Sequence, residues 1–344
     1  MASAKIKDKE QVLAVCEDDA SIITNKFGTK ALEHNVIYPD GKELDYVPMQ
    51  EYSDGSTVFT EVDIIQQAVD RDRSDPARRV TTIYLMSPPG LGKTVLGAYL
   101  AREYNCPYQV INCVSSMTDL DLLGSHVLVG QETIWQDGPL PSIIRAANEE
   151  GMGILVINEL NALTTNAQLG LNPLLDRQQC VVLTLNNNER VAVEEGSHLL
   201  IMASMNPDIL GVNELQDAIR DRSNIVLYLD YPEVEKEAAL ISKLTGLDYE
   251  VAEQFTCVIN ECRLLKTRDH QITQAPSTRG LLDWINYSVV VGSEIAFDVA
   301  VVNRYGTTED ERNALKMIAR GKYITSLKIT QDMFHRDEEI DTAL

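Results

Sequence analysis

The residues best suited to chemistry form a short loop, Ser87-Pro88-Pro89-Gly90-Leu91-Gly92-Lys93-Thr94. Glycines in such a loop let backbone N–H groups point inward around phosphates, and a helix that starts at its end adds partial positive charge. Lys93 would supply a full charge for the β- and γ-phosphates, and the Thr94 hydroxyl could ligate Mg²⁺. The residues expected to contact a bound nucleotide triphosphate are Ser87, Pro88, Pro89, Gly90, Leu91, Gly92, Lys93, Thr94 and Val95.

This loop lies in the sequence context that a phosphate-binding loop requires. It follows the apolar, β-rich run Val80–Met86 and precedes a helical pattern over Val95–Leu100. Ser87 stands where the first glycine of such loops is usual, which matters if the backbone there needs a positive φ angle. The alternative is a Pro/Gly turn that contains Gly-Lys-Thr by chance; the strand–loop–helix order favours the nucleotide site.

A second polar motif follows the apolar run Ile154–Ile157, which reads as a buried strand. Glu159 is the candidate general base that polarises the water attacking the γ-phosphate. The preceding position normally carries the Asp that holds the Mg²⁺ shell, and here it is Asn158. An amide brings no negative charge to a hard cation, so we expect weaker Mg²⁺ retention by Thr94 and Asn158, slower turnover and retained nucleotide binding. The alternative is that Asn158 and Glu159 simply cap the strand.

Asn206 ends the next apolar run, Leu199–Met205, and could orient the attacking water from a neighbouring strand. Since it precedes Pro207, the alternative is a turn-forming residue.

Arginines supply the remaining candidates. Arg220 and Arg222 lie just before the last predicted core strand, and a guanidinium that reaches a γ-phosphate on a neighbouring subunit would stabilise transition-state charge. The alternative is an ion pair within the chain, because Asp217 and Asp221 lie close in sequence. Arg279, near the start of a later predicted helix, could contact the nucleotide of its own subunit or could simply be solvated.

The elements that must position these residues alternate between strands and helices from residue 80 onward. This order predicts a parallel sheet with helices on both faces, interrupted by two β-hairpins around residues 130–132 and 186–189. After residue 232 the pattern becomes consecutive amphipathic helices over 233–244, 249–267, 277–290, 294–304 and 309–320. We therefore expect an N-terminal segment of unknown role at 1–60, an α/β nucleotide-binding core at 61–232 and a helical domain at 233–344.

Composition limits the function classes. The 344 residues carry a net charge of −22, which disfavours a broad nucleic-acid footprint. No apolar run is long enough to span a membrane, and the first residues lack the apolar core of a signal peptide. Six cysteines show no paired metal-ligand spacing. These observations predict a cytoplasmic α/β protein with reduced thiols.

Taken together, the chain from about residue 61 to 290 resembles the AAA+ ATPases, and more narrowly the MoxR group, which carries a hairpin inserted in the second core helix. The motifs that resemble this group are Asp121-Leu122-Leu123-Gly124 with the following hairpin, Gly138-Pro139-Leu140 and residues 154–161. Asn206-Pro207, Gly211-Val212, residues 216–218 and Asp221-Arg222 are similar to the gas-vesicle N-type ATPases. The CbbQ, NorQ and CobS ATPases share parts of the same pattern.

This resemblance implies a P-loop AAA+ core with a C-terminal helical lid, assembled into a hexameric ring with ATP and Mg²⁺ at subunit interfaces. Lys93 and Thr94 match Walker A, Asn158 and Glu159 match Walker B, and Asn206 matches sensor 1. Arg222 matches the arginine finger, with Arg220 as a second candidate, and Arg279 matches sensor 2. The hairpins would line the pore or one ring face, and a von Willebrand factor A domain protein would be a partner in acting on a protein client.

Three functions follow from these observations. The first is a ring-forming ATPase that acts as a chaperone-like remodelling or assembly factor. The second is an ATP-binding assembly protein whose hydrolysis is attenuated by Asn158. The third is a nucleic-acid motor related to the McrB-type GTPases, which the net charge of −22 disfavours.

Overall fold

The computed structural model describes residues 36–39, 46–129, 132–205, 217–322, 329–330 and 333–334. The chain divides into two compact units. The first comprises the described parts of Met1–Tyr46, Val62–Met86 and Gly92–Tyr228. The second comprises Val47–Glu61, Ser87–Leu91 and the described parts of Leu229–Leu344, so it joins two short upstream segments to the helical residues.

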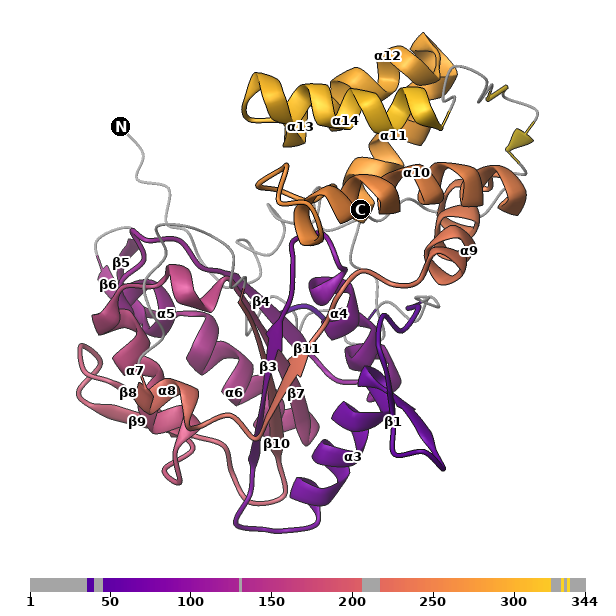
Figure 1. Ribbon diagram of the computed structural model, residues 1–344. Coiled ribbons are helices and arrows are strands. Elements are labelled where there is room, and N and C mark those ends of the chain that lie inside the picture. Colours follow the sequence, from indigo (N-terminus) through magenta and orange to yellow (C-terminus); the bar gives the residue numbers. More distant parts are fainter. Residues whose placement is uncertain are drawn as a thin grey trace, which may run out of the picture. The chain divides into compact units, whose positions relative to one another are not determined.

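A five-stranded parallel sheet forms the centre of the first unit (Figure 1). Across the sheet its strands are β11 (Ile225–Tyr228), β3 (Val80–Met86), β10 (His198–Met205), β7 (Met152–Asn158) and β4 (Tyr108–Asn112). Every neighbouring pair runs parallel, which confirms the predicted α/β class. The segments that follow these strands therefore emerge at one edge of the sheet, where α/β proteins bind their ligands.

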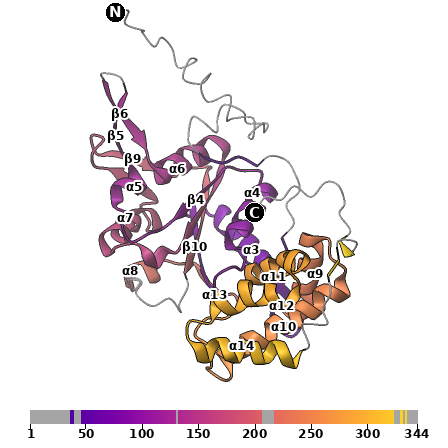
Figure 2. The same ribbon diagram turned by 90° about the horizontal axis from the view of Figure 1, so that it is seen from above.

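Helices cover both faces of this sheet, with α4 (Lys93–Glu103) and α6 (Pro139–Glu150) on opposite sides (Figure 2). The reason is that successive side chains of β7 point to opposite faces. A Cβ atom at Gly97 in α4 would lie 2.3 Å from Val156 Cγ2, whereas a Cβ atom at Gly153 would lie 2.9 Å from Ala147 in α6. The remaining helices here are α3 (Glu61–Arg73, whose first residue belongs to the second unit), α5 (Asp119–Leu123), the 3₁₀ helix η2 (Leu160–Ala162), α7 (Thr165–Leu175) and α8 (Asp217–Arg220).

Two antiparallel hairpins interrupt the α/β alternation, as predicted. They are β5 (Gly124–Val129) with β6 (Glu132–Asp137), and β8 (Cys180–Leu183) with β9 (Glu189–Ala192). Arg145 of α6 connects them, because its Nε donates to Asp137 Oδ2 at 2.7 Å and its Nη2 donates to Glu189 Oε1 at 2.6 Å. One guanidinium thus holds both hairpins to the same helix.

The second unit is helical, as the amphipathic pattern predicts. Its helices are α9 (Val234–Thr245), α10 (Tyr249–Thr267), α11 (Thr278–Val291), α12 (Ser293–Phe297), α13 (Asn303–Tyr305) and α14 (Glu309–Gly321). The unit also contains the upstream hairpin of β1 (Glu51–Ser53) and β2 (Val58–Thr60). The continuous helix expected over 294–304 is instead divided by a π-helical turn, η3 (Asp298–Val302). Trp284 packs between Phe255 and Phe297, with ring centroids 4.3 and 4.9 Å away, and forms the centre of the core.

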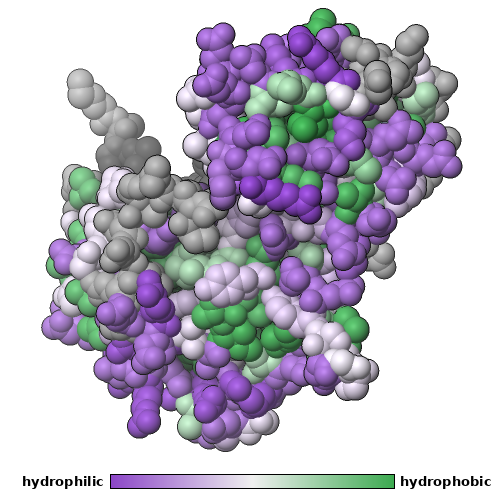
Figure 3. Space-filling view, viewed as in Figure 1, coloured by the Kyte–Doolittle hydropathy of each residue, from purple (hydrophilic) through white to green (hydrophobic). Residues whose placement is uncertain are grey.

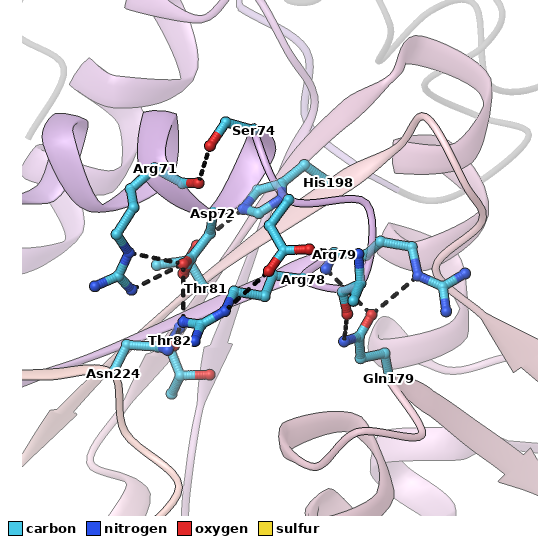
Figure 4. Close-up of polar contacts among 12 residues, drawn as sticks. Arg71, Asp72, Ser74, Arg78, Arg79, Thr81, Thr82, Gln179, His198 and Asn224 are labelled. Carbon is cyan, nitrogen blue, oxygen red and sulfur yellow. Dashed lines mark hydrogen bonds and ion pairs between the residues drawn. The ribbon is translucent and has the colours of Figure 1, made fainter.

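A buried polar cluster lies where β3 and β10 begin, at the edge of the sheet opposite to the strand ends (Figure 4). Thr81 Oγ1 donates to Asp72 Oδ2 and lies 2.9 Å from His198 Nε2. Arg71 and Arg78 neutralise the same carboxylate through Oδ1. Burial lowers the pKa of His198 to about 4, although the charge of Asp72 opposes the shift. This cluster joins α3 to the sheet.

The surface carries many hydrophilic residues. On the face shown in Figure 3, hydrophilic residues are interrupted by patches of hydrophobic ones. Among the described residues, no helix is long and apolar enough to cross a membrane.

Candidate active site

The loop from Ser87 to Thr94 joins β3 to α4, as predicted. Its two glycines adopt left-handed conformations, with φ of 82° at Gly90 and 65° at Gly92, which only glycine adopts without strain. Ser87 is not among the described non-glycine residues with positive φ, so the serine fits where a glycine is usual. Within the described residues no side chain caps the first turn of α4, and N–H groups at such a helix start can bind phosphate.

Lys93 is the first residue of α4 and lies in a partly buried position. Burial lowers the pKa of its ammonium group to about 8, although the carboxylate of Glu159 opposes the shift. The ammonium group is therefore charged at neutral pH but poorly solvated. A bound phosphate group would supply the favourable contacts that solvent water would otherwise make. This environment suits a lysine that binds a polyanion.

Asn158 ends β7 and connects the loop helix to the sheet through its amide. Its Nδ2 donates to Thr94 Oγ1 at 3.0 Å and to Asn112 Oδ1 at 2.8 Å, and its Oδ1 accepts from Ser204 Oγ at 3.3 Å. Sequence reasoning missed Asn112 and Ser204 as site residues. The signal was present, because Asn112 ends β4 and pairs in register with Asn158, and Ser204 lies near the end of β10.

Glu159 follows directly and leaves the strand in an unusual conformation. It is exposed and has a left-handed backbone, with φ 57° and ψ 46°, which is uncommon for a residue with a side chain. Among the described residues its side chain makes no capping hydrogen bond to η2. Strained conformations of this kind concentrate at functional sites, because the turn directs a side chain where function needs it.

Arg222 contacts the end of α7, where it forms an ion pair within the chain. Its Nη1 donates to Asn172 Oδ1 at 3.0 Å, and its Nη2 lies 3.4 Å from Asp176 Oδ2. Asn172 and Asp176 are two further residues that the sequence did not indicate. Arg220 ends α8 and is exposed.

Arg279 belongs to the second unit, and so does the first part of the phosphate loop, Ser87–Leu91. A Cβ atom at Gly90 would lie 2.8 Å from Ser277 Cβ and 3.9 Å from the backbone nitrogen of Arg279. The start of α11 therefore contacts the loop directly. Asn206, the remaining candidate, lies outside the described residues.

The side chains around Thr94 fit a magnesium ion only in part. The Thr94 oxygen is a suitable ligand, but Asn158 turns its NH₂ group toward that oxygen and brings no negative charge. In the described part of the chain, no group of three or more His, Cys, Asp or Glu side chains could hold a metal ion. Proteins usually hold Mg²⁺ through one or two carboxylates together with substrate phosphates. A magnesium ion here would depend on Thr94 and on the nucleotide itself.

Comparison with known families decides what this α/β unit is. The AAA domain family of the dynein-related subfamily matches residues 83–223, which include the loop, Asn158, Glu159 and Arg222. Residues 83–223 form an AAA+ ATPase domain. The predicted P-loop fold and ATPase class are thereby confirmed, and the helices of the second unit follow the matched residues in the chain.

Curated relatives of this AAA+ ATPase are of the MoxR type, at modest identity. Protein NorQ of Paracoccus denitrificans is 27% identical over 198 residues, which are 57% of this chain and 69% of NorQ. Protein CbbQ of Hydrogenophilus thermoluteolus is 27% identical over 255 residues, which are 73% of this chain and 91% of CbbQ. The gas vesicle ATPase GvpN of Haloferax mediterranei is 30% identical over 229 residues, 60% of this chain and 62% of GvpN. The predicted resemblance to the MoxR group is confirmed.

Proposed function

We propose that this AAA+ ATPase binds ATP with Mg²⁺ on the loop Ser87–Val95 and hydrolyses it to remodel or assemble a protein client. The observation that carries the proposal is the hydrogen bond from Asn158 Nδ2 to Thr94 Oγ1, together with the position of Glu159 directly after Asn158. It brings the first turn of α4 to the end of β7, so that a hydroxyl ligand and a carboxylate base lie at one edge of the sheet.

Each residue has a role in this proposal. Lys93 binds the β- and γ-phosphates, and Glu159 polarises the attacking water. Mg²⁺, when bound by Thr94 beside Asn158 and by the nucleotide, neutralises phosphate charge. The residues proposed to complete the site are Asn206, which orients water, Arg222 and Arg220, which act on a neighbouring subunit, and Arg279, which contacts the nucleotide of its own subunit.

We infer a homo-oligomer, because a site on one subunit that uses Arg222 of another requires assembly. A hexameric ring with a von Willebrand factor A domain partner and a protein client is the arrangement that the MoxR resemblance supports. The core would comprise residues 61–232 and the lid residues 233–344. The net charge of −22 argues against nucleic acid as the client. A cytoplasmic location fits the described cysteines, which are free and mostly buried.

The test is steady-state ATP turnover by the purified chain with and without Mg²⁺. Lys93→Ala should abolish both nucleotide binding and turnover, whereas Glu159→Gln should abolish turnover and leave binding intact. Glu195→Gln makes the same chemical change at an exposed position and serves as the matched control. A parent protein that binds ATP with no measurable turnover would overturn the hydrolytic role.

One observation favours a second function, an ATP-binding assembly protein with attenuated hydrolysis. Asn158 donates to Thr94 Oγ1, where a carboxylate would instead accept a hydrogen bond and attract the metal. Hydrolysis would then be slow and would serve as a timer for assembly. A turnover well below one per minute, combined with ATP-dependent oligomerisation, would support this function over remodelling.

A further inference from the structure

Two tyrosines of the second unit support the phosphate loop. Tyr231 contacts the loop itself, and Tyr305 contacts Ser277, which lies against Gly90 of the loop. The first is Tyr231, whose Oη donates to the carbonyl oxygen of Pro89 at 3.4 Å. Burial raises the pKa of Tyr231, so its hydroxyl keeps its proton and remains a donor. The ring also stacks below a guanidinium, because Arg263 Cζ lies 3.8 Å from its centroid. Both the hydroxyl group and the aromatic ring of Tyr231 thus make specific contacts.

The guanidinium above Tyr231 is itself fixed. Arg263 forms a two-pronged ion pair with Glu237, with N–O distances of 2.5 and 2.7 Å, and both side chains are almost fully buried. Arg263 Nε also donates to the Pro276 carbonyl at 2.9 Å, and Thr278 Oγ1 donates to Glu237 at 2.7 Å. A buried pair with these partners holds one geometry, so Tyr231 rests on a rigid support.

The second tyrosine acts on the start of α11. Tyr305 Oη accepts from the backbone nitrogen of Ser277 at 3.2 Å and lies 2.8 Å from Ser277 Oγ. Ser277 caps α11 by accepting from Gly280 N, and the same Ser277 touches Gly90, where a Cβ atom would approach Ser277 Cβ to 2.8 Å. Tyr305 therefore holds Ser277 in place, and Ser277 lies against Gly90, a glycine of the loop with a left-handed backbone conformation.

We propose that Tyr231 and Tyr305 are positioning residues that hold Pro89 and Gly90 in the conformation that receives the nucleotide phosphates. The inference rests on the proposed function, in which this loop binds ATP. A phosphate loop binds through backbone N–H groups, so its affinity depends on keeping the backbone preorganised. Neither tyrosine needs to touch the nucleotide, because each acts on the backbone of the loop.

The experiment compares Tyr231→Phe and Tyr305→Phe with the parent protein. We expect each variant to bind fluorescently labelled ATP about threefold to tenfold more weakly, the range for losing one hydrogen bond. Tyr287→Phe, at an exposed tyrosine on α11, is the matched control and should leave the Kd unchanged. Ser277→Ala removes one partner of Tyr305 and should weaken binding in the same direction. If the two tyrosines had only a structural role, the variants would have a lower melting temperature but an unchanged Kd for ATP in the folded protein. That result would overturn the proposal.

A second readout separates this proposal from the proposed function. Amide hydrogen exchange at residues 90–93, measured without nucleotide, should speed up in both phenylalanine variants and stay constant in Tyr287→Phe. Unchanged exchange would overturn the positioning role even if the parent binds ATP. Failure of the parent to bind ATP, with Lys93→Ala as reference, would overturn the proposed function, while faster exchange would still show that the tyrosines hold the loop.

Discussion

The amide nitrogen of Asn158 lies 3.0 Å from the hydroxyl oxygen of Thr94 and donates a hydrogen bond to it. The same nitrogen donates to Asn112, so both of its hydrogens are used inside the protein. In this arrangement the hydroxyl that should bind the metal already accepts a hydrogen bond from a neutral group. The residue types around the loop favour nucleotide binding more than metal binding.

Replacement of Asn158 by Asp should therefore increase turnover. A carboxylate cannot donate to Thr94, so it would accept from the hydroxyl and add negative charge beside the Mg²⁺ position. We expect turnover to rise about tenfold, equivalent to about 1.4 kcal/mol of barrier, and half-saturation to need less Mg²⁺. Steady-state ATPase assays over a Mg²⁺ titration measure both. Asn187→Asp, in an exposed turn, is the matched control; equal rates for Asn158→Asp and the parent would refute the attenuation argument.

Nucleotide affinity should fall as the pH rises above about 8. Burial holds the pKa of Lys93 at about 8 in the free protein, and bound phosphates would raise that pKa because they favour the charged form. Binding is thus fully supported well below pH 8 and weakens by up to about tenfold per pH unit above it. Fluorescence titrations between pH 7 and 9.5 measure the effect. Lys93→Arg stays protonated throughout and should give a flat profile; a flat profile in the parent would contradict the prediction.

Loss of Arg222 should affect turnover much more than stability. Its contact with Asp176 is partly exposed, and such pairs contribute about 0.2–1 kcal/mol. If Arg222 acts on a neighbouring subunit, Arg222→Ala should lower turnover about a thousandfold. Arg220→Ala should cost less, and Arg177→Ala is the exposed control next to Asp176.

Mixing two inactive variants shows on which subunit Arg222 acts. Arg222→Ala chains keep Lys93, and Lys93→Ala chains keep Arg222. Mixed oligomers should regain part of the activity if the arginine acts in trans. No recovery in mixtures that demonstrably co-assemble would place its action within one chain.

Acid should destabilise the protein partly through His198. Its pKa is 6.5 in an unfolded chain and about 4 in the folded protein. Between these values the unfolded chain binds more protons, so stability falls as the pH falls from 6.5 toward 4. Thermal denaturation should show a steeper loss of melting temperature for the parent than for His198→Gln. Parallel curves would mean that His198 does not contribute to acid sensitivity.

Two glycines in helices provide a matched test of packing. A Cβ atom at Gly97 would lie 2.3 Å from Val156 Cγ2, so Gly97→Ala should force α4 away from β7 and destabilise by about 1–3 kcal/mol. A Cβ atom at Gly170 in α7 would meet nothing closer than 3.9 Å, so Gly170→Ala should stabilise by about 0.5–1 kcal/mol. Urea unfolding measures both, and effects of the same sign would contradict this packing.

Much of the fold could be predicted from the sequence because its signals are local. The apolar run before Asn158 predicts a buried strand, and β7 ends there. The amphipathic pattern over Tyr249–Thr267 gives α10 with the same bounds. The run over 294–304 predicted one helix, and the structure divides it with η3, since helical periodicity does not distinguish an α-helix from a π-helical turn.

By itself the sequence determined the phosphate loop, the buried strands and the residue types at their ends, because spacing and periodicity are properties of neighbouring residues. Only the tertiary structure decided the partners. It placed β4 beside β7, which brings Asn112 to Asn158, and it paired Arg222 with Asp176, which lies in a distant segment of the sequence. Strand order and contacts between distant segments depend on the packing of the whole unit, which no local pattern encodes.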